Sequence, residues 1–149
     1  MIAVLAFATV AIFGVTAWAS ASSGFHPTAT ARGTLSGDIH LNTDRIKFQT
    51  KGDVDVVAQN VTIDPGGYSG WHWHPGFVLV VVEQGTVTLQ VGCTVTTYPA
   101  GASFHETGNS PTQASNMGTE PVMARVTYVI PHTSPPTPTR YEVASAPVC

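Results

Sequence analysis

Short β-prone segments separated by glycine- and proline-containing turns constrain the fold of this chain more than any other feature. Downstream of Gly24, no segment keeps the 3.6-residue apolar period of an amphipathic helix. Short strands at regular spacing with such turns are typical of all-β sandwiches and closed barrels. We therefore predict an all-β fold, with strands at Arg45–Gln49, Val54–Ile63, 71–74, 77–82, Thr86–Val91, Thr94–Tyr98, Ala102–Glu106 and Val122–Ile130.

Three of these segments carry more specific expectations. The strand Val54–Ile63 is expected to end at the turn Asp64-Pro65-Gly66-Gly67. The valine-rich run that ends at Val82 is expected to be buried on both faces or to form a barrel wall. The dipeptide Gln84-Gly85 predicts a tight hairpin into Thr86–Val91.

The low charge of the chain argues against nucleic acid as a partner. Only 10% of the residues are charged, the net charge is −3, and the basic residues form no cluster. Proteins that bind nucleic acid or acidic surfaces carry a basic patch that is absent from this sequence.

Residues 1–21 differ in kind from the rest of the chain. Residues 2–19 hold no charge, and small residues follow that offer Ala-x-Ala cleavage patterns after Ala19 or Ala21. This pattern predicts an export signal, although no Lys or Arg precedes the apolar run. The alternatives are an uncleaved membrane anchor at 2–19 and a buried helix of the fold. The first two interpretations place the domain outside the cytoplasm, either secreted or anchored, and give it no other contact with a membrane.

The remaining chain divides into a polar linker and N-terminal extension at 22–44, a barrel at 45–131, and an extended, proline-rich tail at 132–149. The two cysteines, Cys93 and Cys149, form an even pair that an oxidising compartment is expected to join. Such a bridge would fasten the tail to the barrel and contribute about 4 kcal/mol in the chain-entropy model. Two unrelated free thiols are the alternative.

Two histidines stand two residues apart in the aromatic segment Trp71-His72-Trp73-His74. On a strand, side chains at i and i+2 share a face, so His72 and His74 point the same way and the tryptophans cover the other face. Imidazole is a common ligand of first-row metals. The pair therefore predicts half of a metal site.

The order of these features resembles the cupin family, over about residues 52 to 131. The first family motif, Gly-x5-His-x-His followed by a carboxylate and a hairpin glycine, is similar to Gly66/Gly67, His72, His74 and Gly85. The second motif is similar to Pro99-x-Gly101 and a following strand, closed by Asn116-Met117-Gly118-Thr119-Glu120-Pro121. The resemblance implies a jelly-roll barrel of six to eight strands with the two histidines facing the lumen, and it makes a homodimer an expectation.

The chain departs from the family pattern at its metal ligands. Val78 stands seven residues before Gly85, where the family commonly has a glutamate. The second motif has two registers: one supplies a third imidazole at His105, and the other ends at Asn116 and puts Pro111 or Thr112 at the histidine position. We favour the second register because it fits the strand spacing.

The remaining candidates for a third metal ligand are His105 and Glu106. These residues are adjacent on a predicted strand, so they face opposite sides and only one of them can join His72 and His74. His105 would complete a three-histidine site, whereas Glu106 would complete a site of two histidines and one carboxylate.

Two functions of different classes follow. The first is a metal-dependent enzyme of the cupin type, such as a small oxygenase or isomerase, which holds a divalent metal: Mn, Fe, Zn or Ni. The second is a non-catalytic exported cupin that has lost its metal and binds a small molecule in an apolar lumen, or acts at a surface. No Ser/His/Asp arrangement or phosphate-binding loop adds a third.

Overall fold

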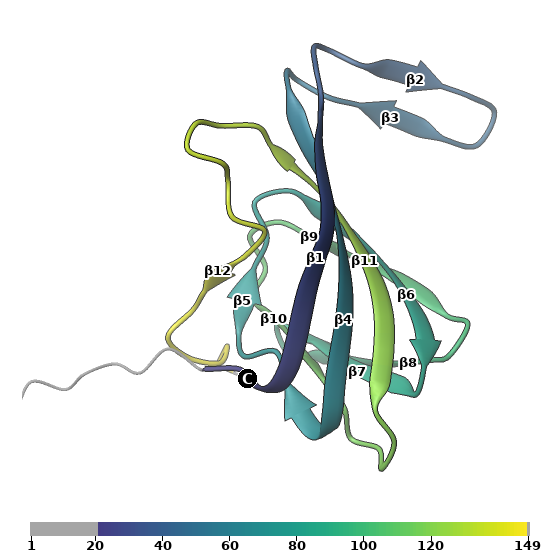
Figure 1. The fold of residues 1–149 in the computed structure, drawn as a ribbon, viewed down its shortest axis with the longest axis vertical. Helices are drawn as coiled ribbons and strands as arrows, with labels where there is room; N and C mark the ends of the chain where they lie inside the picture. The colour runs from purple at the N-terminus through teal and green to yellow at the C-terminus, as the bar shows by residue number, and fades with distance from the viewer. Residues whose placement is uncertain (1–20, 149) are drawn as a thin grey trace, which may run out of the picture.

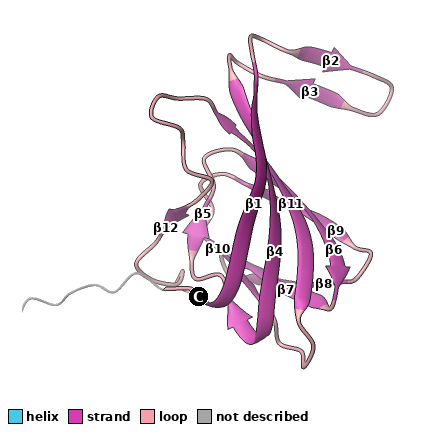
Figure 2. Cartoon of the chain, in the orientation of Figure 1, coloured by secondary structure: helices cyan, strands magenta, loops and turns pink. Residues whose placement is uncertain are grey.

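The computed structural model describes residues 21–148, and this part of the chain folds as strands and loops without a helix (Figures 1 and 2). The predicted all-β class is confirmed. No helix of the length and apolarity needed to cross a membrane occurs within this range. The strands are β1 (Ser23–Leu35), β2 (His40–Asn42), β3 (Lys47–Gln49), β4 (Val54–Tyr68), β5 (His72–Trp73), β6 (Phe77–Gln84), β7 (Thr86–Val91), β8 (Thr94–Pro99), β9 (Ser103–Thr107), β10 (Thr112–Ser115), β11 (Val122–Pro131) and β12 (Tyr141–Glu142).

The strands form two antiparallel layers that enclose one core (Figure 1). The first layer runs β1-β4-β11-β6-β9, and the second runs β12-β5-β10-β7-β8. The layers join where Ser115 of β10 pairs with Tyr68 of β4. This arrangement is a nearly closed jelly-roll barrel, while β2 and β3 form a separate hairpin.

The core follows from the alternation of side chains along each strand. In β6, Val78, Val80 and Val82 are buried, whereas Leu79 and Val81 are each 49% exposed. The valine-rich run is therefore a barrel wall with one solvent-facing side, and the expectation of burial on both faces is wrong. Inward-facing residues of β4, β6, β7, β9 and β11 make up the rest of the core.

The segment 22–44 is not a linker, because most of it is the long strand β1, which pairs with β4 from Leu35 to Ser23. The sheet thus starts at residue 23, not at 45. The strand escaped prediction because it lies at a sheet edge and most of its side chains are exposed, so its sequence lacks an apolar alternation. The turn expected at 64–67 lies inside β4, which runs on to Tyr68: the pairing with β1 is interrupted between Ile63 and Tyr68, and Gly66 has a φ of 74°.

Gln84-Gly85 is a turn, but it does not make the predicted hairpin. Strand β6 pairs with β11 and β9, whereas β7 pairs with β10 and β8, so the turn carries the chain from one layer to the other. Gly85 has a φ of 74°, and a Cβ added there would lie 2.9 Å from the carbonyl oxygen of Pro121. Glycine is required because this crossing packs the backbone tightly.

The proline-rich tail packs along the barrel and contributes one short strand, β12, beside β5. The Tyr141 ring stacks on Trp73, with ring centroids 4.4 Å apart. Near the end of the tail, Sγ of Cys93, which is not a free cysteine, lies 3.7 Å from the carbonyl oxygen of Val148. Cys149 and the predicted signal or anchor at 1–20 lie outside the described residues, so the pairing of the cysteines stays a prediction.

Candidate metal centre

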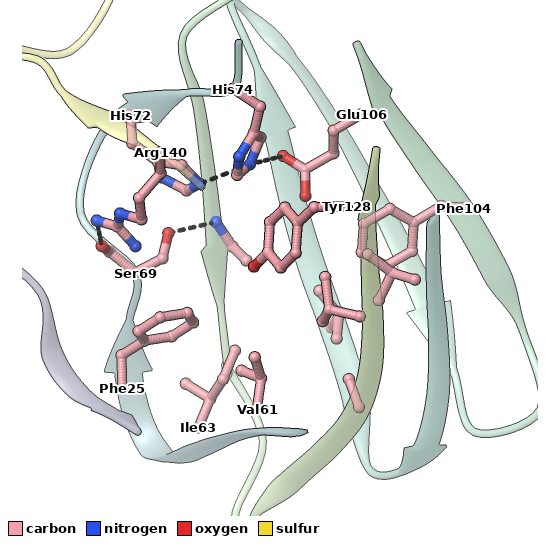
Figure 3. Close-up of a pocket in the computed structure, with 15 residues that line it drawn as sticks. Phe25, Val61, Ile63, Ser69, His72, His74, Phe104, Glu106, Tyr128 and Arg140 are labelled. Carbon is pink, nitrogen blue, oxygen red and sulfur yellow. Dashed lines mark hydrogen bonds and ion pairs between the residues drawn. The ribbon is translucent and has the colours of Figure 1, made fainter. Parts of the chain in front are cut away.

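His72 and His74 lie on one face, as the sequence predicts, and both line a cavity inside the barrel (Figure 3). Only 4% of His72 and 3% of His74 are exposed. Strand β5 holds His72, and His74 follows just before the chain turns through Pro75 and Gly76. A Cβ on Gly76 would lie 2.0 Å from the carbonyl oxygen of Val129, so glycine lets this segment press against β11.

Each histidine is held through its Nδ1 atom. Nδ1 of His72 lies 2.9 Å from the carbonyl oxygen of Gly70, and Nδ1 of His74 lies 2.7 Å from that of Thr139. A carbonyl oxygen only accepts, so each Nδ1 donates its proton. In neutral rings the Nε2 atoms are then both acceptors, and they lie 3.1 Å apart. Metal-binding histidines are fixed in this way, with the second ring nitrogen donating to a carbonyl.

Glu106 of β9 brings a carboxylate to the same point. Its Oε2 lies 3.7 Å from Nε2 of His74, and ligand atoms of the three residues lie within 4.8 Å of one another. In the sheet, Glu106 is the direct partner of Val78 on β6. Glu106 on the neighbouring strand therefore supplies the carboxylate that the family motif commonly has at the position of Val78.

Two buried polar atoms in this region have no hydrogen-bond partner among the described residues: Glu106 Oε2 and Thr112 Oγ1. A buried carboxylate oxygen without a donor is costly, and the nearby Nε2 atoms cannot donate when the rings are neutral. A cation between the three acceptors removes this cost. The residues therefore fit a divalent transition metal held by two imidazoles and one carboxylate.

The protonation states suit such ligands. Burial, followed by the positive charge of Arg140, lowers the pKa of His72 to about 4, so this ring is neutral at pH 7. Burial raises the pKa of Glu106, but a polar interaction with His74, the charges that His74 and His72 carry in their protonated forms, and a polar interaction with Thr112 together outweigh burial and leave the pKa below its usual value. A neutral imidazole and an ionised carboxylate are the forms that bind metals.

His105 does not join this group. It is exposed on the outer face of β9, directly opposite the half-exposed Leu79 of β6. The three-histidine alternative is therefore wrong, because strand alternation turns Glu106 inward and His105 outward.

The second motif follows the favoured register. Asn116 is 1% exposed, and its side chain donates to the carbonyl oxygens of Ile63 and Glu120 and accepts from the Gly118 amide, which closes the turn. Thr112, four residues earlier, is buried opposite His72. A hydroxyl thus occupies the position at which the family motif has a histidine.

The cavity is small and mostly apolar (Figure 3). A volume of about 40 Å³ inside it is open to the centres of water molecules. Arg140, which no sequence motif singled out, lines this cavity from the tail and donates to the carbonyl oxygen of Ser69 at 2.6 Å. The apolar side chains that share the lining include Phe25, Val61, Ile63, Val80 and Phe104.

The fold and this site define a two-layer β-barrel with a His-His-carboxylate centre in its lumen. Residues 59–130 match the sequence profile of the cupin domain family. These residues therefore form a cupin domain, as the motifs predicted.

The chain is similar to three solved structures, each over part of its length. A Klebsiella pneumoniae protein with a double-stranded β-helix domain is 26% identical over 51% of this chain and 67% of its own, with a TM-score of 0.47. Oxalate decarboxylase from Bacillus subtilis, which has Mn(II) centres, is 21% identical over 52% of this chain, with a TM-score of 0.48. The matched region spans 22% of that enzyme.

A conserved protein of unknown function from Streptococcus pyogenes is 16% identical over 68% of this chain and 77% of its own, with a TM-score of 0.48. No curated protein sequence gives a significant match.

Proposed function

We propose that this protein is an exported cupin that binds one divalent transition metal through His72, His74 and Glu106. The single observation that carries the proposal is the convergence of three acceptors in a buried cavity without a donor between them. Both imidazoles are held by carbonyl oxygens on the far side, which leaves each Nε2 directed at the shared point. Such a preorganised set binds a metal without first rearranging.

The chemical types of the three ligands narrow the choice of metal. Two imidazoles and one carboxylate leave open coordination positions and are typical of non-haem iron, and manganese, nickel and zinc accept the same ligands. A metal held this way acts as a Lewis acid or a redox centre toward a small molecule. Thr112, the strand partner of His72, carries a neutral hydroxyl, and of the three ligands Glu106 is the one with a negative charge.

Titration of the metal-free protein with Mn²⁺, Fe²⁺, Zn²⁺ and Ni²⁺, followed by calorimetry, tests the proposal. We expect one metal per chain in the wild type. We expect affinity to fall by more than about a hundredfold in E106Q and in H72A. The matched control is H105A, which removes the imidazole beside Glu106 on the outer face and should bind like the wild type. Equal binding by E106Q and wild type would refute the site.

A barrel that only binds an apolar small molecule is the competing function. Its support is the lining of valine, isoleucine and phenylalanine side chains. The open volume of about 40 Å³ is far less than the several hundred Å³ of a typical ligand pocket. We therefore favour a metal with one or two very small ligands.

Export rests on the apolar N-terminal segment and on the cysteines. The carbonyl oxygen of Val148 lies 3.7 Å from Sγ of Cys93, so the end of the tail lies beside this cysteine. If the protein is exported and oxidised, the mature chain should begin near Ser20 or Ser22, and its intact mass should lie about two hydrogens below that of the reduced form. A retained Met1 in membranes would favour the anchor, and an unchanged mass would refute the bridge.

A further inference from the structure

Arg140 lies beside the candidate metal ligands without touching them. It reaches the cavity from the C-terminal tail, far in sequence from His72 and Glu106, and lies on the same side of the cavity as His72 and Ser69 (Figure 3). Its side chain is 18% exposed. Among the residues that line this cavity, Arg140 is the cationic side chain that cannot lose its charge at neutral pH.

The tail holds this arginine firmly in place. On one side, the carbonyl of Thr139 accepts from His74; on the other, Tyr141 stacks on Trp73 and belongs to β12. The guanidinium itself lies over the Phe25 ring, 5.5 Å from its centroid. A cation held between two anchored residues is preorganised for recognition.

The hydrogen bonds of the Arg140 guanidinium with the described residues involve Nε and Nη2 but not Nη1. Nη2 donates to Ser69 at 2.6 Å and to Glu142 at 2.7 Å, and Nε donates to Glu142 at 2.7 Å. Nη1 makes no hydrogen bond within residues 21–148. Arginine recognises carboxylates through such N–H groups.

Charge favours an anion at this point. A divalent metal and Glu106 together carry one positive charge, and Arg140 adds another in a mostly apolar cavity. Glu142 balances part of this charge through its hydrogen bonds to Nε and Nη2, but it lies toward solvent, with a side chain that is 47% exposed, and leaves Nη1 without an acceptor in the described part of the chain. Positive charge in apolar surroundings is costly unless an anion accompanies it.

We propose that Arg140 forms an anion subsite beside the metal, so that the ligand of this protein is a small carboxylate. The proposal rests on the metal site of the proposed function and names its ligand class. The cavity volume of about 40 Å³ restricts that ligand to a very small molecule unless the tail moves. Formate meets this limit, and formamide is its neutral counterpart of nearly the same size.

The test measures formate and formamide binding to the Mn²⁺-loaded full chain by calorimetry, in the wild type and in R140Q, R140K and E142Q. We expect the wild type to bind formate at least about tenfold more tightly than formamide, and R140Q to lose about tenfold or more of its formate affinity. E142Q removes the exposed partner of the same guanidinium and should bind formate as tightly as the wild type or more tightly.

R140K separates charge from packing, because it keeps a cation even if the tail shifts; we expect it to bind formate more tightly than R140Q does. Formate affinity that is equal in wild type and R140Q, or equal to formamide affinity, would overturn the subsite while the metal site stands. Failure of the wild type to bind Mn²⁺ or another divalent metal would overturn both.

Discussion

Two buried carboxylates, Asp55 and Glu106, lie in opposite surroundings. Asp55 accepts hydrogen bonds from Nε of Arg32, the Thr34 hydroxyl and Nδ1 of His132, each at 2.8 Å. Glu106 lies among acceptors, and its Oε2 has no hydrogen-bond partner within the described residues. The protein itself supplies the donors for the first carboxylate, whereas the second would be completed by the cation that we propose to bind there.

This difference separates structure from function in the same barrel. The donors around Asp55 come from β1 and from the segment after β11, and Arg32 also donates to the carbonyl oxygen of Thr137 in the tail. Asp55 thus fastens β1, β4 and the tail together. Glu106 has no such set of donors, and the metal that we propose would give it a role in binding.

The largest expected effect is on stability at Asp55. Replacing it in D55N leaves the Arg32 charge without its partner and should lower the free energy of unfolding by about 3 kcal/mol. This is the lower end for a broken buried pair, because the Arg32 side chain is 33% exposed. Urea unfolding measures the loss. The control D44N removes a carboxylate that is 87% exposed and should change stability by less than about 0.5 kcal/mol.

The loss of stability at low pH gives a second test of the role of Asp55. Burial raises the pKa of Asp55, but its hydrogen bonds to Arg32, Thr34 and His132 outweigh burial and lower the pKa to about 2. A depressed carboxyl pKa stabilises the fold above the unfolded value, near 4, and this stability is lost as pH falls toward 2. The loss should be about 2 kcal/mol in the wild type. A D55N variant with the same loss between pH 4 and pH 2 would assign it to another group.

The smallest effect is expected for E106Q without metal. The amide keeps the size of the carboxylate, and its NH₂ group can donate to the acceptors that Glu106 faces. Its free energy of unfolding should therefore lie within about 1 kcal/mol of that of the metal-free wild type. Addition of metal should then raise the melting temperature of the wild type but not of E106Q. A large loss of stability in metal-free E106Q would make Glu106 a structural residue like Asp55.

The alternation of side chains along a single strand predicted two of the three candidate ligands. Side chains at i and i+2 share a strand face, and this rule places His72 and His74 together from their spacing alone. The same alternation showed that His105 and Glu106 exclude each other but not which one faces inward. That choice depends on the register between β6 and β9, where Glu106 pairs with Val78. Register is a tertiary property that one strand does not encode.

The remaining contacts join segments far apart in the chain. Arg140 reaches Ser69 across 71 positions, and Arg32 reaches Thr137 across 105. Neither pair leaves a periodic signal in the sequence. Strand β1 was missed for a related reason, because its exposed side chains follow no apolar pattern. The hairpin predicted at Gln84-Gly85 failed because a turn motif does not determine which strands pair.

The metal centre is tested most simply by the metal content of the protein purified from its native cells, measured by elemental mass spectrometry beside H72A/H74A. We predict close to one divalent metal per chain in the wild type and little or none in the variant. A folded wild type that carries no metal, and takes up none when it is offered, would contradict the proposed centre.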